Sequence, residues 1–251
     1  MPVLPGAEPF RADGGPVGAL VLHGFTGNPM SMRPWAEHLA AAGLSVRLPR
    51  LPGHGTRWQD LNATRWEDWY AEAERGLEEL RSTCERVVVC GLSMGGTLAL
   101  RLGEARAGDL SALVVVNPSL TTDDRRAVLL PLLSRIVPSM PPVGEDIKKP
   151  GVTEGAYDKL PTRGAASLRK LWGVVLDDLP RITAPVLAFR SLDDHVVPAS
   201  SVARLVAGAT STTVTVRELR DSYHVATLDN DAPLIFRETL EFVRGLAPVG
   251  A

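Results

Sequence analysis

The sequence predicts an α/β fold, with a mostly parallel central sheet, helices on both faces and a small inserted cap. Short apolar runs alternate with segments of helical periodicity, first up to residue 118 and again from residue 180. The stretch 119–179 between them contains no run of the same strand type. The chain has 251 residues, of which 45% are hydrophobic, which is enough to bury a core of this size.

The strands are predicted from short apolar runs that end at glycine-rich or polar turns. Such a run is typical of a parallel strand that is buried on both faces. VGALVL, for example, ends at His23 and Gly24, and the next run ends at the turn-rich segment LPGHG. The predicted strands are 17–22, 44–48, 87–90, 113–116, 186–190 and 213–219.

The helices are predicted from the spacing of apolar residues. The segment 64–80 has the clearest amphipathic pattern, and Thr64 with Glu67 predicts a capping box at its start. Gly43 suits the end of the helix that precedes the second strand. The predicted helices are 29–42, 64–80, the GGTLALRL run to about residue 107, a helical run at 165–175, and 233–246.

The stretch 119–179 interrupts the alternation of strands and helices. It holds the apolar run VLLPLLSRIVPSM and the segment PPVGEDIKKPG. A long helical connection is one interpretation, and an insertion over the sheet is the other. We prefer the insertion because long segments of this kind are usually lids or disordered, and this one is too apolar for disorder. The sequence therefore predicts a core of residues 1–118 and 180–251 and an inserted cap of residues 119–179.

Charge and composition argue against several classes of protein. The 27 basic and 29 acidic side chains nearly balance and form no run of five like charges, so we expect no nucleic-acid partner. No apolar stretch approaches the ~20 residues of a spanning helix. The first fifteen residues predict no secretory signal, and we expect a cytoplasmic protein. Cys84 and Cys90 are too few for a disulfide framework or a zinc cluster.

The pentapeptide Gly91-Leu92-Ser93-Met94-Gly95 matches the motif G-x-S-x-G. It follows the apolar run VVVC and opens a helix, which is the strand–turn–helix setting that the motif requires. A sharp turn of this kind strains the serine backbone, and the two glycines avoid clashes between Cβ atoms and neighbouring chains. We predict that Ser93 is a nucleophile and that the Met94 N–H faces the same space. The alternative is a glycine-rich turn with an incidental serine.

The segment HGFTG, residues 23–27, follows the strand that we expect beside the nucleophile strand. Such a loop supplies the second oxyanion donor in this arrangement, so Phe25 N–H is predicted to act with Met94 N–H. His23 and His54 are interpreted as structural histidines that stabilise a loop and a turn. Neither is interpreted as a catalytic base.

Two histidines, His195 and His224, follow Ser93 in the chain and are candidates for the base. His224 comes just after the last strand, where a loop can reach the nucleophile, whereas His195 follows the preceding strand, where the acid is expected. Asp193 and Asp194 are both candidates for that acid. We prefer Asp194 because the turn HVVP follows it. The predicted base takes the serine proton, and the acid orients the imidazole.

These motifs resemble the α/β-hydrolase superfamily, and most closely its small bacterial monoacylglycerol lipase and carboxylesterase group. HGFTG, LPGHG, GLSMGG, DHVVP and SYHVATLDND look like the signatures of that group, in its order, from about residue 17 to residue 231. The resemblance implies Ser93, Asp194 and His224 as the catalytic triad. It also implies an oxyanion hole formed by the backbone N–H groups of the residues in HGFTG and GLSMGG named above.

The resemblance further implies a small mobile cap that holds the substrate. In the monoacylglycerol lipases a cap glutamate helps to hold the glycerol head group, and Glu154 looks equivalent to it. The alternative for Glu154 is a solvated surface carboxylate. Ile136, Val137 and Met140 are predicted to line an acyl tunnel, although these helices could also simply bury their own apolar faces.

The expected chemistry is two-step acyl transfer from an uncharged ester to water, with no metal and no organic cofactor. Monoacylglycerols are the preferred substrates because a long acyl chain requires an apolar surface such as the one that the cap offers. A broad carboxylesterase for short- to medium-chain acyl esters is the main alternative. A ligand-binding protein without turnover is a third hypothesis. The cap could also make transient contact with lipid aggregates.

Overall fold

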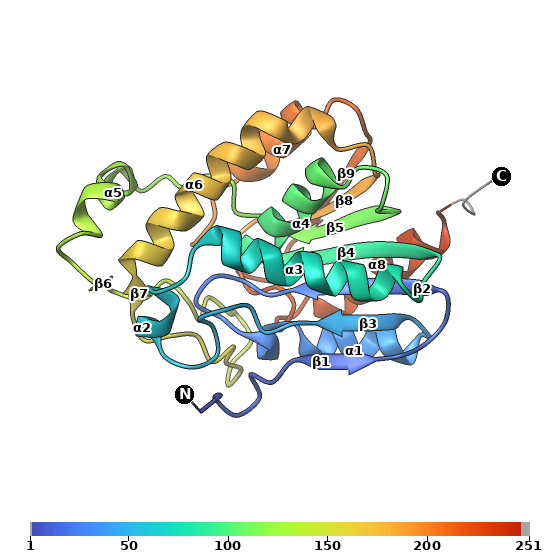
Figure 1. Ribbon diagram of the computed structural model, residues 1–251, viewed down its shortest axis with the longest axis horizontal. Helices are drawn as coiled ribbons and strands as arrows, with labels where there is room; N and C mark the ends of the chain where they lie inside the picture. The colour runs from blue at the N-terminus through green and yellow to red at the C-terminus, as the bar shows by residue number, and fades with distance from the viewer. Residues whose placement is uncertain (1, 247–251) are drawn as a thin grey trace.

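A computed structural model describes residues 2–246 of the chain. A seven-stranded sheet forms its centre, in the order β1-β3-β2-β4-β5-β8-β9 (Figure 1). β1 is antiparallel to β3, and every other neighbouring pair in this sheet is parallel. Its strands are β1 (Phe10–Ala12), β2 (Val17–Leu22), β3 (Ser45–Leu48), β4 (Arg86–Leu92), β5 (Ala112–Val116), β8 (Val186–Ser191) and β9 (Val214–Leu219).

Helices cover both faces of this sheet. The α-helices are α1 (Arg33–Ala41), α2 (Trp58–Leu61), α3 (Trp66–Arg81), α4 (Met94–Ala105), α5 (Leu130–Leu133), α6 (Thr162–Asp178), α7 (Ser200–Gly208) and α8 (Ala232–Arg244). Side chains of α3, α4, α6 and α7 pack on one face, and side chains of α1 and α8 pack on the other (Figure 1). The predicted fold class is therefore confirmed.

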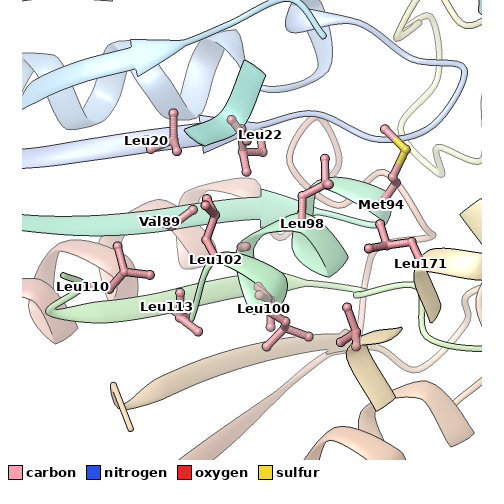
Figure 2. Close-up of a cluster of buried hydrophobic side chains, with 14 of the residues drawn as sticks. Leu20, Leu22, Val89, Met94, Leu98, Leu100, Leu102, Leu110, Leu113 and Leu171 are labelled. Atoms are coloured by element: carbon pink, nitrogen blue, oxygen red, sulfur yellow. The ribbon is translucent and has the colours of Figure 1, made fainter. Parts of the chain in front are cut away.

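Two hydrophobic clusters, one on each face, explain why the central strands are apolar throughout. Leu20 and Leu22 of β2 belong to the first cluster, while Ala19 and Val21 of the same strand belong to the second. All four are fully buried because successive side chains of a strand point to opposite faces. Figure 2 shows the first cluster, in which side chains of β2 and β4 lie with Leu98 and other residues of α4.

The predicted strands and the long helices match the observed ones to within four residues at each end. The sequence pattern did not reveal β1, α2 or α7. β1 has only three residues and lies at the edge of the sheet, where it pairs with β3 alone. A segment that short carries no periodicity that distinguishes it from a loop.

The capping box predicted on Thr64 and Glu67 is wrong in its residues, which lie one position too early. The helix begins at Trp66, and the N–H of its N-cap residue, Arg65, donates to the Asp68 carboxylate over 2.8 Å. The Thr64 hydroxyl accepts instead from Nε1 of Trp69, over 2.9 Å, and donates to a backbone carbonyl. The helix begins one residue later than a Thr64 cap requires, so Arg65 takes the N-cap position and Thr64 bonds to neighbours within five residues instead.

The stretch 119–179 has an outer part and a part that packs on the core. The 3-10 helix η2 (Arg125–Leu129), α5 and a two-stranded antiparallel pair lie in the outer part, and the pair joins β6 (Ser139–Met140) to β7 (Leu160–Pro161). α6 packs on α3 and α4, and its Leu171 is fully buried in the first cluster. Between residues 2 and 246, no helix is long and apolar enough to cross a membrane.

Replacement of Gly95 by alanine is expected to lower the free energy of unfolding by about 3 kcal/mol or more. A Cβ atom there would overlap the carbonyl oxygen of Leu22 and would lie 2.7 Å from that of His23. Neither backbone atom can move without disturbing the sheet. Gly173→Ala is the matched control, because Gly173 is an exposed helical glycine with no atom within 4 Å of such a Cβ.

Urea denaturation of the two variants checks this expectation. Gly173→Ala should leave stability unchanged or raise it by up to about 1 kcal/mol, as expected for glycine in a helix. A Gly95→Ala protein as stable as the unmodified chain would contradict the close backbone contact.

Candidate active site

Ser93 occupies a strained turn between β4 and α4. Its φ of 54° and ψ of −118° lie in a region that non-glycine residues rarely adopt. Hydrogen bonds hold the turn, since Ser93 N–H donates to Val116 O over 2.9 Å and Ser93 O accepts from Thr97 N–H over 3.1 Å. The turn therefore lifts the serine out of the strand at the carboxyl end of the sheet.

The structure brings together Asp194 and His224, two of the candidates for acid and base. His224 Nδ1 lies 2.8 Å from Asp194 Oδ2, and both side chains are buried. The other carboxylate oxygen of Asp194 accepts the N–H groups of Val196 and Val197, over 2.9 and 2.8 Å. The turn that follows the acid thus fixes its orientation and leaves one oxygen for the imidazole.

The alternative candidates lie nearer the surface. The Asp193 side chain is 62% exposed, and the His195 side chain is 55% exposed. His195 Nδ1 lies 2.8 Å from Oδ1 of Asp146, a residue of the inserted stretch. The geometry of the site thus favours Asp194 over Asp193, and His224 over His195.

The surroundings of His224 favour its protonated form. Burial opposes protonation, but the hydrogen bond to Asp194 and the negative charges of Asp194, Glu154 and Asp146 outweigh it and raise the pKa of His224 above 6.5. Burial likewise opposes the charge of Asp194, but the contact with His224 and the two N–H donors hold its pKa below 3.8. An imidazolium formed at His224 would therefore face an ionised partner.

Ser93, Asp194 and His224 line one cavity of about 660 Å³. Much of its apolar wall comes from the inserted stretch: Leu130, Met140, Val143, Leu160, Leu168 and Trp172. Ala165, Leu168 and Trp172 recur at helical spacing along one face of α6, so the same periodicity that predicted the helix could have identified them.

Of the predicted acyl-lining residues, the structure places Met140 on the cavity wall but not Ile136 or Val137. Ile136 is 77% exposed, and Val137 is 37% exposed. Their backbone N–H groups both donate to Leu133 O in a turn that follows α5, and the two side chains lie on the outer surface. An apolar run does not indicate by itself which of its faces turns inward, and this is why the prediction failed.

The HGFTG loop lies against Ser93. A Cβ atom on Gly24 would be 3.5 Å from Ser93 Cβ, and Phe25 lines the cavity. Met94 is the first residue of α4, where backbone N–H groups have no partner within the helix. The two residues that carry the predicted oxyanion donors thus lie in the loop beside Ser93 and at the start of the helix that follows it.

His23 fixes the loop, as its structural interpretation predicts. Its Nδ1 lies 2.9 Å from Gly24 O, and its Nε2 accepts Leu51 N–H over 3.1 Å. The neutral imidazole satisfies both contacts, with the proton on Nδ1. Complete burial lowers the pKa of His23 to about 4, so the ring stays neutral at physiological pH.

Glu154 lines the same cavity and is only 5% exposed, so the interpretation as a solvated surface carboxylate is wrong. Its Oε1 accepts Glu145 N–H over 3.1 Å, and Asn28 Nδ2 donates to the carbonyl oxygens of Glu154 and Gly155. Burial raises the pKa of Glu154 to about 7. A buried carboxyl group with hydrogen-bonding capacity therefore faces the cavity.

Asn117 is a site residue that the sequence analysis missed. It follows β5 directly, with a φ of 44°, and its Nδ2 donates to His224 O over 2.8 Å and to Ser191 Oγ over 3.0 Å. Its position after a parallel strand was the available signal, because polar residues there lie at the carboxyl edge of the sheet. Asn117 anchors the backbone of His224 to the core.

Residues 2–246 contain no group of three His, Cys, Asp or Glu side chains arranged to hold a metal ion. That the chain uses neither a metal nor a cofactor stays a prediction.

A family model described as "Alpha/beta hydrolase family" matches residues 19–235. The chain belongs to the alpha/beta hydrolase family. This hydrolase is 45% identical over 246 residues to a thermostable monoacylglycerol lipase of a Bacillus species, with 96% of each chain covered. It is 26% identical over 240 residues to a carboxylesterase of Bacillus subtilis, which covers 95% of the hydrolase and 97% of that relative.

Solved structures agree with this membership. The hydrolase superposes with a TM-score of 0.94 and 37% identity on a structure reported with two metagenome-derived lipolytic enzymes, LipS and LipT, covering 97% of this chain and 99% of that one. A monoacylglycerol lipase of Paleococcus ferrophilus, at 22% identity and a TM-score of 0.77, shares the fold over 96% of the hydrolase and 100% of its own chain. The chain is thus similar to lipolytic enzymes over nearly its whole length.

The pKa of His224, followed by NMR of its ring protons, is expected to lie above 6.5 and to fall in Asp194→Asn. This substitution removes the hydrogen bond and the charge that favour the imidazolium, while burial, which opposes it, remains. Asp193→Asn is the matched control and should leave the pKa of His224 unchanged, since Asp193 is exposed and does not contact this ring. A pKa at or below 6.5 in the unmodified hydrolase would contradict the electrostatics described above.

Proposed function

We propose that the hydrolase cleaves monoacylglycerols to free fatty acid and glycerol, with Ser93, His224 and Asp194 as its catalytic triad. The observation that carries this proposal is the set of residues that line the cavity. It combines the strained serine, the buried acid–base pair, an apolar wall and the buried carboxyl group of Glu154. The 45% identical relative, named as a monoacylglycerol lipase, supports the same substrate class.

In the acylation step, Ser93 Oγ attacks the ester carbonyl carbon and His224 Nε2 takes the serine proton. Asp194 keeps the other ring nitrogen protonated and stabilises the imidazolium. The N–H groups of Phe25 and Met94 would donate to the oxyanion of the tetrahedral intermediate. The bond between the carbonyl carbon and the glycerol oxygen then breaks, and His224 gives its proton to the departing glycerol.

In the deacylation step, water takes the place of glycerol. His224 removes a proton from the water, whose oxygen attacks the acyl carbon, and the ester bond to Ser93 breaks. The proton passes to Ser93 Oγ, and the fatty acid leaves. Burial of His23 and its low pKa keep that imidazole out of these proton transfers.

Glu154 is the residue that we assign to the glycerol head group. Glycerol hydroxyls donate to a carboxylate and accept from a carboxylic acid, and a pKa of about 7 makes both forms of Glu154 accessible near neutral pH. Met140, Leu168 and Trp172 line the apolar wall and would hold the single acyl chain. In a cavity of about 660 Å³ we expect little room for the further chains of di- and triacylglycerols.

We further propose that residues 119–179 act as the cap and that its outer surface contacts lipid aggregates. Val128, Leu129, Leu132 and Ile136 are between 55% and 77% exposed there. Apolar side chains gathered on one surface are typical of sites that contact other molecules or lipids. A rate of hydrolysis that rises once the substrate aggregates would support this contact, and an unchanged rate would contradict it. The cytoplasmic location stays a prediction.

Hydrolysis of matched mono-, di- and triacylglycerols, with p-nitrophenyl butyrate as a head-group-free ester, tests the proposed function. We expect monoacylglycerols to be cleaved with the highest kcat/KM. Ser93→Ala should lower kcat by about 10⁶-fold on every ester. Similar kcat/KM values for short acyl esters and monoacylglycerols would instead identify a carboxylesterase of broad specificity. Binding without turnover would identify the third hypothesis, a ligand-binding protein.

Glu154→Gln tests the head-group assignment within the same panel. The KM for monoacylglycerols is expected to rise at least about fivefold, because hydrogen bonds to a carboxylate are lost or weakened. The KM for p-nitrophenyl butyrate should stay within twofold, since that ester has no glycerol. Asp158→Asn, which changes an exposed acid of the same stretch, is the control. An unchanged KM for monoacylglycerols in Glu154→Gln would remove the assignment.

A further inference from the structure

Asp146 belongs to the inserted stretch, yet its carboxylate joins the two loops that carry the acid and the base. Oδ2 accepts the backbone N–H of His195 over 3.2 Å and the backbone N–H of His224 over 3.1 Å. Oδ1 lies 2.8 Å from His195 Nδ1. The Asp146 side chain is only 15% exposed and its contact with His224 is partly buried, whereas its contacts with His195 lie at the surface. A single carboxylate of the inserted stretch thus accepts hydrogen bonds from both loops.

The backbone and ring of His224 are held at three points. Asp194 holds ring atom Nδ1, Asn117 donates to the backbone carbonyl, and Asp146 accepts the backbone N–H. Asp194 and Asn117 follow strands of the core sheet, whereas Asp146 comes from the inserted stretch. One of these three contacts with His224 therefore comes from outside the core.

The segment around Asp146 is itself fixed to the loop of His224. The Asp229 carboxylate, which is 2% exposed, accepts the N–H groups of Lys148 and Lys149 over 2.8 and 2.9 Å. Its Oδ2 also accepts Tyr223 N–H over 2.9 Å. In addition, Asp146 O accepts the N–H of the residue after His224 over 3.1 Å. Each segment thus offers a carboxylate to the backbone of the other, and the position of Asp146 is well determined.

We propose that Asp146 is a positioning residue for the base, so that the cap completes the catalytic site as well as the acyl pocket. The inference rests on the role proposed for His224. Carboxylate acceptors form stronger and shorter hydrogen bonds with N–H groups than neutral acceptors do. Without this anchor, only the contacts with Asn117 and Asp194 hold His224, and its loop is free to shift. A small misplacement of a catalytic group lowers the rate steeply.

The charge of Asp146 has a second effect on the same histidine. Three carboxyl groups act on the His224 ring, namely those of Asp194, Glu154 and Asp146, and all three favour its protonated form. The imidazole of His195, whose side chain is 55% exposed, pairs with the same carboxylate. Loss of Asp146 therefore removes both an anchor of the loop and part of the field that stabilises the imidazolium.

Kinetics of Asp146→Ala and Asp146→Asn on p-nitrophenyl butyrate test this inference. For Asp146→Ala, kcat is expected to fall about 10- to 100-fold while KM stays within about threefold, because transition-state positioning is lost rather than binding. The acidic limb of the kcat/KM profile should move to lower pH. Asp146→Asn should retain part of the activity, since its amide oxygen still accepts an N–H. Asp193→Asn, which removes a neighbouring charge that also faces His195, should keep kcat within twofold.

A folded Asp146→Ala protein whose kcat and acidic limb match the unmodified hydrolase would overturn the inference. Circular dichroism establishes folding, and if Asp146→Ala does not fold, Asp146→Asn decides. A kcat reduced at least threefold with a shifted limb then supports the inference, and an unmodified kcat and limb overturn it. His224→Ala separates the two proposals. If that variant stays active, the proposed mechanism fails, whereas an inactive His224→Ala beside a fully active Asp146→Ala refutes only the role of Asp146.

Discussion

The turn between β4 and α4 leaves no space for a side chain two residues before or two residues after Ser93. A Cβ atom on Gly91 would overlap the carbonyl of Gly95, and one on Gly95 would overlap the carbonyl of Leu22. At this turn, β2, β4 and α4 therefore approach one another through backbone atoms. This contact strains Ser93 into its unusual conformation and also brings the HGFTG loop, which follows β2, against the serine.

The parallel sheet supplies the remaining groups to the same edge. Asn117, Asp194 and His224 follow β5, β8 and β9, whose carboxyl ends lie beside that of β4. Residues 119–179 line the same cavity with apolar side chains, with the buried carboxyl group of Glu154 and with that of Asp146, whose side chain is 15% exposed. The strand ends thus position Ser93, Asp194 and His224, while residues 119–179 supply much of the apolar cavity wall and a carboxylate that accepts the His224 N–H.

Sequence reasoning predicted what local pattern and strand order determine. The apolar run of β2, the strained serine and the residues at the ends of β8 and β9 all follow from short segments with a fixed relation to the sheet. Thr64 was predicted wrongly as the helix cap because α3 begins at Trp66, so that Arg65 takes the N-cap position, and the bounds of a helix are only loosely set by its apolar spacing. Ile136 was predicted wrongly as a cavity residue, because packing decides which side chains of an apolar run turn inward. Asp146 could not be predicted, because its partner His224 is 78 residues away in the chain.

Covalent labelling with a fluorophosphonate, followed by mass spectrometry of peptides, tests most directly whether Ser93 is the nucleophile of this site. The reagent attaches to a serine oxygen that a neighbouring base activates. The geometry described above predicts a single adduct per chain, on the peptide that contains Ser93, and strongly slowed labelling in His224→Ala. An adduct on another residue, or ester hydrolysis that persists after Ser93 is replaced by alanine, would contradict it.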